Sequence, residues 1–254
     1  MNKLVLGLAA AALLSTVAMA EAAGPSDDIQ KAVADPLRPD AARTLDAERK
    51  PAEMLAFAGV KAGDKVADLM PGAGYFTLLF SDVAGPKGHV YAVVPTEILK
   101  FGPRATDGIN ALTAQKKNVS LVTVPINAFA VGEKLDLVWT SQNYHDFHDK
   151  FMGPADVAKV NKAIFDALKP GGVYLVLDHA AEAGSGLRDT DTLHRIDPAA
   201  VKAEVTAAGF VFAGESKVLV NPADAHDKNV FDGAIRHHTD QFIYKFVKPK
   251  SAKP

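Results

Sequence analysis

The chain has 254 residues, of which 48% are hydrophobic and 23% are charged, and its formal net charge at pH 7 is −2. This composition is typical of a globular protein, and the length suits a single α/β domain. Because the net charge is close to zero, we expect neither a nucleic acid nor an anionic membrane as a partner. The sequence contains no cysteine, which excludes disulfides, thiolate metal sites and thiol nucleophiles.

Residues 1–20 have the pattern of a secretory signal peptide. A basic head (1–3) precedes an apolar run (4–17) and an Ala-Met-Ala cleavage site (18–20). The alternative is a membrane anchor, but the apolar run is shorter than the ~20 residues that span a bilayer. We therefore expect cleavage after Ala20, export to the periplasm or the medium, and no stable membrane anchor.

The remaining chain divides into an extension, one domain and a short tail. Residues 21–42 are small, polar and proline-bearing, and we interpret them as a linker or a loose first helix. The domain is expected to cover residues 43–249, and residues 250–254 form the tail. Residues 43–50 carry many charges, which form either a solvated helix face or the mouth of a site.

The strongest local signal is a short apolar strand at residues 65–69, followed by a glycine-rich turn and a helix. Phe76, Leu79, Phe80 and Val83 lie on one face of this helix. Such a unit directs backbone N–H groups at a ligand from the helix N-terminus. Glycine permits the close approach or positive φ that the turn needs. By itself the match is weak, because many such turns only connect a strand to a helix.

Strands and helices alternate along the rest of the chain. Strands are expected at residues 89–94, 119–124, 135–139 and 173–177, helices at 51–58, 157–168 and 198–208, and two last strands at 210–220 and 241–247. This alternation predicts a doubly wound parallel sheet. Residues 221–240 contain no clear helix that would make a crossover, so the last two strands are predicted to pair antiparallel.

Five stretches carry a family resemblance in their order and spacing. They are Val-Ala-Asp-Leu-Met-Pro-Gly-Ala-Gly-Tyr-Phe-Thr (66–77), Gly-His-Val-Tyr-Ala-Val (88–93), Leu-Asp-Leu-Val (135–138), Leu-Lys-Pro-Gly-Gly-Val-Tyr-Leu-Val (168–176) and His-Arg-Ile-Asp-Pro (194–198). Together they resemble the motifs of class I S-adenosylmethionine-dependent methyltransferases. The resemblance implies an α/β fold, a Rossmann-like doubly wound seven-stranded sheet with an antiparallel last strand. It also implies S-adenosyl-L-methionine as cofactor and methyl transfer as the reaction. Nicotinamide dehydrogenases lack the antiparallel last strand.

The same resemblance places the cofactor site at the ends of the first three strands. The residues expected to contact the cofactor are Asp68, Gly72, Ala73, Gly74, Tyr75, Val94, Glu97 and Asn127. Met70 stands where the family usually has glycine, and Val94 stands where it usually has the acidic residue that holds both ribose hydroxyls. Pro95 keeps Val94 extended and carries the chain outward, so Glu97 is the expected replacement for that carboxylate. Asn127 falls where a polar side chain often contacts the adenine edge.

The residues after the fourth strand fall where the family faces the methyl group and the acceptor. Tyr144, His145 and Asp146 are the candidate catalytic residues, with His145 as a general base for an unactivated O–H or N–H acceptor. Alternatively, His145 and His148 are ordinary surface-loop histidines. Neither this stretch nor residues 237–238 have the helical spacing of a zincin, so no metal site is expected.

The acceptor is expected to be a small molecule, and the sequence does not indicate an oligomeric state. Two alternatives remain for the function. The first is a binding module that has lost catalysis, which the departures at Met70 and Val94 favour. The second is a protein that uses only the fold for interactions, and it would lack a nucleoside-sized pocket at the strand ends.

Overall fold

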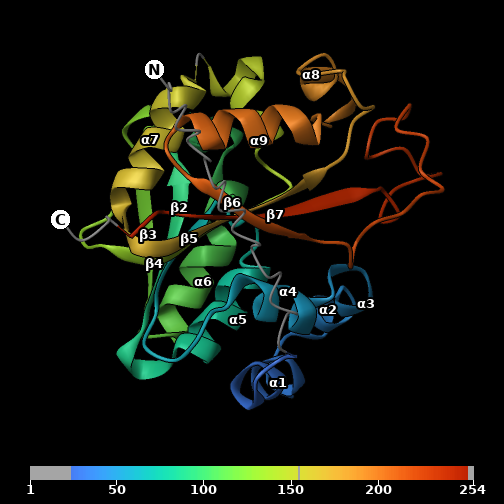
Figure 1. Cartoon of the computed structure of the whole chain (residues 1–254). Helices are drawn as coiled ribbons and strands as arrows, with labels where there is room; N and C mark the ends of the chain where they lie inside the picture. Colours follow the sequence, from blue (N-terminus) through green and yellow to red (C-terminus); the bar gives the residue numbers. More distant parts are fainter. Residues whose placement is uncertain (1–23, 154, 251–254) are drawn as a thin grey trace, which may run out of the picture.

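The computed structural model describes residues 24–153 and 155–250, which form a seven-stranded sheet with helices on both faces (Figure 1). The strands are β1 (Lys65–Leu69), β2 (His89–Pro95), β3 (Val119–Val124), β4 (Leu135–Ser141), β5 (Leu168–His179), β6 (Val211–Ser216) and β7 (Gln241–Val247). Their order across the sheet is β3-β2-β1-β4-β5-β7-β6. The predicted signal peptide and its cleavage site lie outside the described residues, so export stays a prediction.

The last strand reverses the direction of the sheet. The pairs from β3 across to β5 are parallel, whereas β7 runs antiparallel to both of its neighbours, β5 and β6. No helix lies between β6 and β7, so the chain has no crossover and returns beside the strand it has just left. The predicted Rossmann-like sheet with an antiparallel last strand is therefore confirmed. The order leaves a topological switch point between β1 and β4, where α/β sheets of this kind bind ligands.

Alternate residues of the central strands face two different hydrophobic layers. Ala67 and Leu69 pack with residues of α7 and α9, whereas Val66 packs with residues of α1, α4 and α5. The helices are α1 (Asp27–Ala34), α2 (Asp40–Arg43), α3 (Asp46–Arg49), α4 (Pro51–Ala58), α5 (Tyr75–Ala84), α6 (Asp107–Gln115), α7 (Val157–Ala167), α8 (Thr190–Leu193) and α9 (Pro198–Ala207). Burial of both sheet faces explains why the strands read as continuous apolar runs. None of the described helices is long and apolar enough to cross a membrane.

The N-terminal extension contains a first helix, α1, which was one of its two interpretations, and this helix packs on the domain. Ile29 and Ala32 of α1 are buried in the same cluster as Met54 and Leu55 of α4. Further along, the buried Arg38 guanidinium donates two hydrogen bonds to the Asp46 carboxylate at 2.6 and 2.8 Å. This bidentate contact, together with the apolar face of α1, places α3 beside the glycine-rich turn.

Candidate functional site

The glycine-rich turn between β1 and α5 adopts left-handed backbone conformations. Met70, Gly72 and Gly74 have φ values of 57°, 56° and 86°. Met70 therefore occupies a conformation that favours glycine. This is the physical reason why the family that the sequence resembles usually has glycine at this position. A Cβ on Gly72 would meet open space, so the backbone there is accessible to a ligand. A Cβ on Gly108 of α6 would lie 2.8 Å from the Ala73 Cα, so α6 packs directly against the turn.

A cavity of about 220 Å³, which we call the turn cavity, lies in front of this turn. It opens between the carboxyl ends of β1 and β4, at the topological switch point. Its lining residues are Leu45, Arg49, Asp68, Met70, Pro71, Gly72, Ala73, Tyr75, Phe76, Ser141, Gln142 and Asn143. The Asn143 side-chain amide donates to the carbonyls of Met70 (3.0 Å) and Ser141 (2.6 Å), and so fixes the turn to the end of β4.

Asp68 places a buried carboxyl at the floor of the turn cavity. Its Oδ2 accepts a hydrogen bond of 2.6 Å from the Thr77 hydroxyl. Burial raises the pKa of Asp68 to about 7, although the Thr77 hydroxyl and the Arg49 charge act in the opposite direction. This carboxyl therefore changes its charge in the neutral range, and a cationic ligand group would favour the ionised form.

We expect Asp68→Asn to remove a pH-dependent loss of stability. The folded-state pKa of about 7 lies above the ordinary value of 3.8. Asp68 therefore contributes stability that is present below the ordinary value and is lost as the pH rises through about 7. Denaturant titrations at about pH 4, 6 and 8 should show the wild type losing free energy of unfolding relative to Asp68→Asn between the first and last values. If the free energy of unfolding changed with pH in the same way in both proteins, Asp68 would not have the raised pKa.

Arg49 of α3 carries the cationic group of the site. Its guanidinium lies over the Tyr75 ring, 4.6 Å from the ring centroid, while the Tyr75 hydroxyl donates to Asp46 Oδ1 at 2.6 Å. Among the described residues, no carboxylate forms an ion pair with Arg49. The stretch of charges at residues 43–50 thus lines the mouth of a site, which was one of its two interpretations.

A second cavity of about 200 Å³ adjoins the turn cavity on the side of β7, and we call it the β7-side cavity. The two cavities share Arg49, Phe76, Ser141 and Gln142 as wall residues. The other lining residues are Glu48, Leu177, His179, Leu219, Val230, Phe231, Arg236, His237, Thr239 and Gln241. An ion pair of 2.9 Å between His237 Nδ1 and Glu48 Oε2 closes this cavity toward α3.

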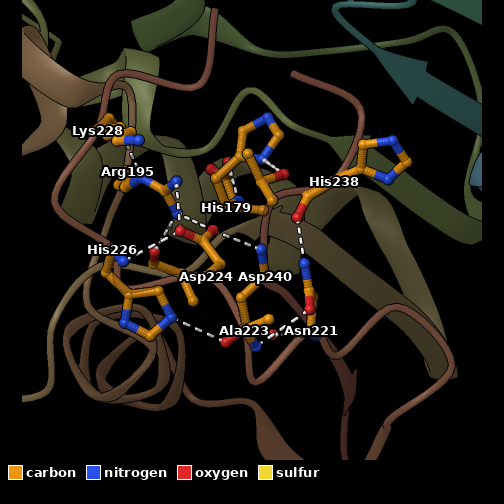
Figure 2. Close-up of polar contacts among 12 residues, drawn as sticks. His179, Arg195, Asn221, Ala223, Asp224, His226, Lys228, His238 and Asp240 are labelled. Carbon is orange, nitrogen blue, oxygen red and sulfur yellow. Dashed lines mark hydrogen bonds and ion pairs between the residues drawn. The ribbon is translucent and has the colours of Figure 1, made fainter. Parts of the chain in front are cut away.

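The segment 217–240, which covers the β7-side cavity, is attached to the domain by a buried polar network (Figure 2). The fully buried Arg195 pairs with Asp224 at 2.8 Å and donates to the carbonyls of Ala180 and Lys228 at 2.9 Å each. The Asp240 N–H donates to Asp224 Oδ2 at 2.7 Å, and Asp240 pairs with His226 at 3.0 Å. These contacts attach residues 224–240 to the end of β5 and to the loop that follows α8, and the Val230 N–H donates to the Leu193 carbonyl of α8.

His179 is the imidazole that lines the β7-side cavity. Its Nδ1 lies 2.8 Å from the Thr239 hydroxyl. Burial lowers the pKa of His179 to about 4, against the attraction of Asp178, so the ring is neutral at pH 7. In the tautomer whose Nδ1–H donates to the Thr239 hydroxyl, Nε2 carries the free lone pair. The sequence indicated a place near the site for His179 only through its position at the end of the fifth strand.

The structure places the three predicted catalytic residues away from both cavities. His145 is buried, with Nδ1 at 2.8 Å from Asp178 Oδ1 and Nε2 at 3.2 Å from Asp146 Oδ1. Burial alone would lower the pKa of His145, but the two carboxylates raise it to about 10. The protonated ring cannot accept a proton at pH 7. The Tyr144 hydroxyl is enclosed too, since it donates to Glu204 and accepts from Asn161. We therefore assign no base role to His145, nor a contact with an acceptor to its two neighbours.

The predicted cofactor residues divide into two groups. Asp68, Gly72, Ala73 and Tyr75 line the turn cavity, and Gly74 lies directly behind it as the N-cap of α5. Val94, Glu97 and Asn127 do not line it. Val94 is fully buried, the Glu97 carboxylate accepts from the Ile126 N–H at 3.1 Å, and Asn127 Oδ1 accepts from the Asp156 N–H at 2.8 Å.

Comparisons with known proteins agree with this geometry, although no family model matches the chain. The chain is 29% identical over 143 residues to a protein-L-isoaspartate O-methyltransferase of Ignicoccus hospitalis. It is 32% identical over 124 residues to the ubiquinone/menaquinone biosynthesis C-methyltransferase UbiE of Pasteurella multocida. A solved S-adenosylmethionine-dependent methyltransferase from Aquifex aeolicus superposes with a TM-score of 0.56 at 19% identity, over 87% of this chain and 99% of that one.

The chain therefore has the fold of class I S-adenosylmethionine-dependent methyltransferases. The matches to the two sequence relatives cover 56% and 47% of this chain, and 59% and 41% of the relatives. The chain thus spans about half the length of these curated relatives. An activity and an acceptor are therefore argued from the cavities of this chain.

Proposed function

We propose that the protein transfers a methyl group from S-adenosylmethionine to a small-molecule acceptor bound in the β7-side cavity. One observation carries this proposal: two cavities share a wall at the carboxyl ends of β1 and β4. A methyl donor in the turn cavity and an acceptor in the β7-side cavity would then lie next to each other, beside Ser141 and Gln142. Positioning of this kind supplies most of the rate in a methyl transfer.

The residues of the turn cavity fit the amino-acid end of the cofactor. The unpaired Arg49 guanidinium matches its carboxylate, and the ionised Asp68 carboxylate matches its ammonium group. The open backbone at Gly72 and the N-terminus of α5 leave room for close approach. When bound, the cofactor supplies an electrophilic methyl group on a sulfonium. An acceptor lone pair would form the new bond to the methyl carbon as the carbon–sulfur bond breaks, and that electron pair would stay on sulfur.

The residues of the β7-side cavity fit a small, partly apolar acceptor. Leu219, Val230 and Phe231 supply apolar surface, while the His237–Glu48 pair restricts access of water from the α3 side. His179 Nε2 is the group that would take the proton from an O–H, N–H or S–H acceptor. A titration of the mature protein with S-adenosylhomocysteine tests the cofactor half of the proposal. Absence of binding at millimolar ligand would favour the binding-module alternative.

We expect His179→Gln to lower turnover by ~10²-fold while leaving S-adenosylhomocysteine affinity unchanged, because the glutamine cannot act as a base. The measurement is release of S-adenosylhomocysteine with a panel of small phenols, thiols, amines and carboxylic acids. His238→Gln is the matched control, since His238 lines neither cavity. Equal losses of affinity and turnover in His179→Gln would show a packing role instead.

We further propose that Glu97 holds the ribose hydroxyls in place of an acid at Val94. Both oxygens of the Glu97 carboxylate accept from the Ile126 N–H at 3.1 Å, and Oε2 also accepts from the Thr96 hydroxyl at 3.4 Å, which leaves further acceptor positions on the group. We expect Glu97→Ala to weaken S-adenosylhomocysteine binding by ~10-fold or more, equivalent to about 1.4 kcal/mol. Val94→Asp should not improve binding, because Val94 is fully buried and the new carboxylate would have to be buried without a partner. The proposal is wrong if Glu97→Ala binds the ligand as tightly as the wild type.

A further inference from the structure

Four potential metal ligands meet behind the β7-side cavity, outside both cavities described above. His145, Asp146 and Asp149 come from the loop after β4, and His194 follows α8. One ligand atom from each of the four lies within 4.8 Å of the others. No metal site was expected from the sequence, in which His194 is distant from the other three residues.

Asp149 gives independent evidence that a cation belongs in this cluster. Its side chain is 1% exposed, and neither carboxylate oxygen has a hydrogen-bond partner among the described residues. The Thr190 hydroxyl lies close enough to favour the ionised Asp149 carboxylate, but the hydrogen bond that it donates goes to the Leu187 carbonyl, at 3.4 Å. The His194 Nδ1 lies 3.9 Å from Asp149 Oδ2, beyond hydrogen-bond distance. A buried carboxylate without partners is costly unless it coordinates a cation.

Asp178 orients His145 as a metal ligand. Its Oδ1 accepts from His145 Nδ1–H and its Oδ2 from the His145 backbone N–H, both at 2.8 Å. This arrangement leaves Nε2 of His145 directed toward the Asp146 carboxylate. A carboxylate on the far nitrogen of the imidazole is the usual second contact of a metal-bound histidine. A metal ion would replace the proton that Nε2 otherwise carries.

We propose that His145, Asp146, Asp149 and His194 bind one divalent transition-metal ion, with Zn²⁺ as the expected occupant. Two imidazoles and two carboxylates favour such an ion over Mg²⁺ or Ca²⁺, which prefer oxygen ligands alone. The ion would tie the loop after β4 to the end of α8. The His194 ring in turn contacts Phe231, at 5.1 Å between centroids, and Phe231 lines the β7-side cavity. The proposed role of the ion is therefore to hold Phe231 in place in the wall of the β7-side cavity.

Equilibrium dialysis of the metal-free chain against Zn²⁺, followed by elemental analysis, tests this proposal. We expect one ion per chain in the wild type. Asp149→Asn and His194→Gln should each weaken Zn²⁺ binding by ~100-fold or more, since each removes a direct ligand. His148→Gln is the matched control, because His148 is in the same loop but pairs with Glu204 at 3.2 Å. Substitution with Co²⁺ should give tetrahedral ligand-field bands in the wild type and in His148→Gln alone.

Thermal unfolding distinguishes loss of the site from loss of the fold. Zn²⁺ should raise the midpoint of the wild type and of His148→Gln, but not that of Asp149→Asn. Without metal, Asp149→Asn should melt at or above the wild-type temperature, because an unpaired buried charge is removed. A wild type that retains no Zn²⁺, or an Asp149→Asn variant that retains it equally, would overturn the proposal. S-adenosylhomocysteine affinity is measured separately and tests only the proposed methyl transfer.

Discussion

Arg49→Ala is expected to weaken S-adenosylhomocysteine binding by about 10- to 100-fold. The guanidinium lines both cavities and no described carboxylate pairs with it, so it is available for the carboxylate of the ligand. Charge-assisted hydrogen bonds of this kind are each worth roughly 1.5–3 kcal/mol, which corresponds to the expected change in affinity. Calorimetric titration gives the dissociation constant directly.

Two further variants test whether the effect depends on the guanidinium of Arg49 and on its position. Arg49→Lys should retain part of the affinity, since it keeps the charge but loses the planar donor pair. Arg43→Ala removes an exposed arginine that pairs only with Asp40, and should leave affinity unchanged. The assignment fails if Arg49→Ala binds as tightly as the wild type, or if Arg43→Ala loses as much affinity.

Gly108→Ala is expected to lower the free energy of unfolding by about 1–3 kcal/mol and to weaken S-adenosylhomocysteine binding. Helix propensity alone predicts the opposite sign, because alanine is about 1 kcal/mol better than glycine within a helix. The added Cβ would lie 2.8 Å from both the Ala73 Cα and its carbonyl oxygen, and backbone atoms cannot rotate away as a side chain can. The glycine-rich turn would have to shift toward the cavity.

Gly132→Ala is the control for this experiment, since a Cβ there meets nothing within 4 Å and the φ angle is not positive. Denaturant unfolding should show Gly132→Ala at or above the wild-type stability. An unchanged affinity in Gly108→Ala would mean that α6 does not position the turn.

The predicted parts of the fold were those that depend on local pattern. Residues close together in the sequence determine three of these features: the strand before Met70, the alternation of strands and helices, and the missing crossover before β7. The turn residues Asp68, Gly72 and Ala73 line the turn cavity, because a strand–turn–helix unit places its own ligand-facing backbone, and their contact with the cofactor stays a prediction.

The direction of individual side chains depended on contacts between distant segments. His145 lies in the loop after β4, a strand that ends at the cavities, yet its ring is held away from them by Asp178 of β5. Its pKa then rises to about 10, which no local pattern indicates. His179, one residue beyond Asp178, lines the cavity instead, because neighbours in a strand face opposite sides.

The sequence by itself determined the sheet, its antiparallel last strand and the glycine-rich turn, since periodicity and turn chemistry are local properties. Only the tertiary structure decided that α1 packs on the domain, that Arg49 reaches the turn cavity, and that His194 joins residues of the loop after β4. Each of these depends on a contact between segments far apart in the chain. Such contacts are set by the packing of the whole domain, and the sequence pattern of neither segment records them.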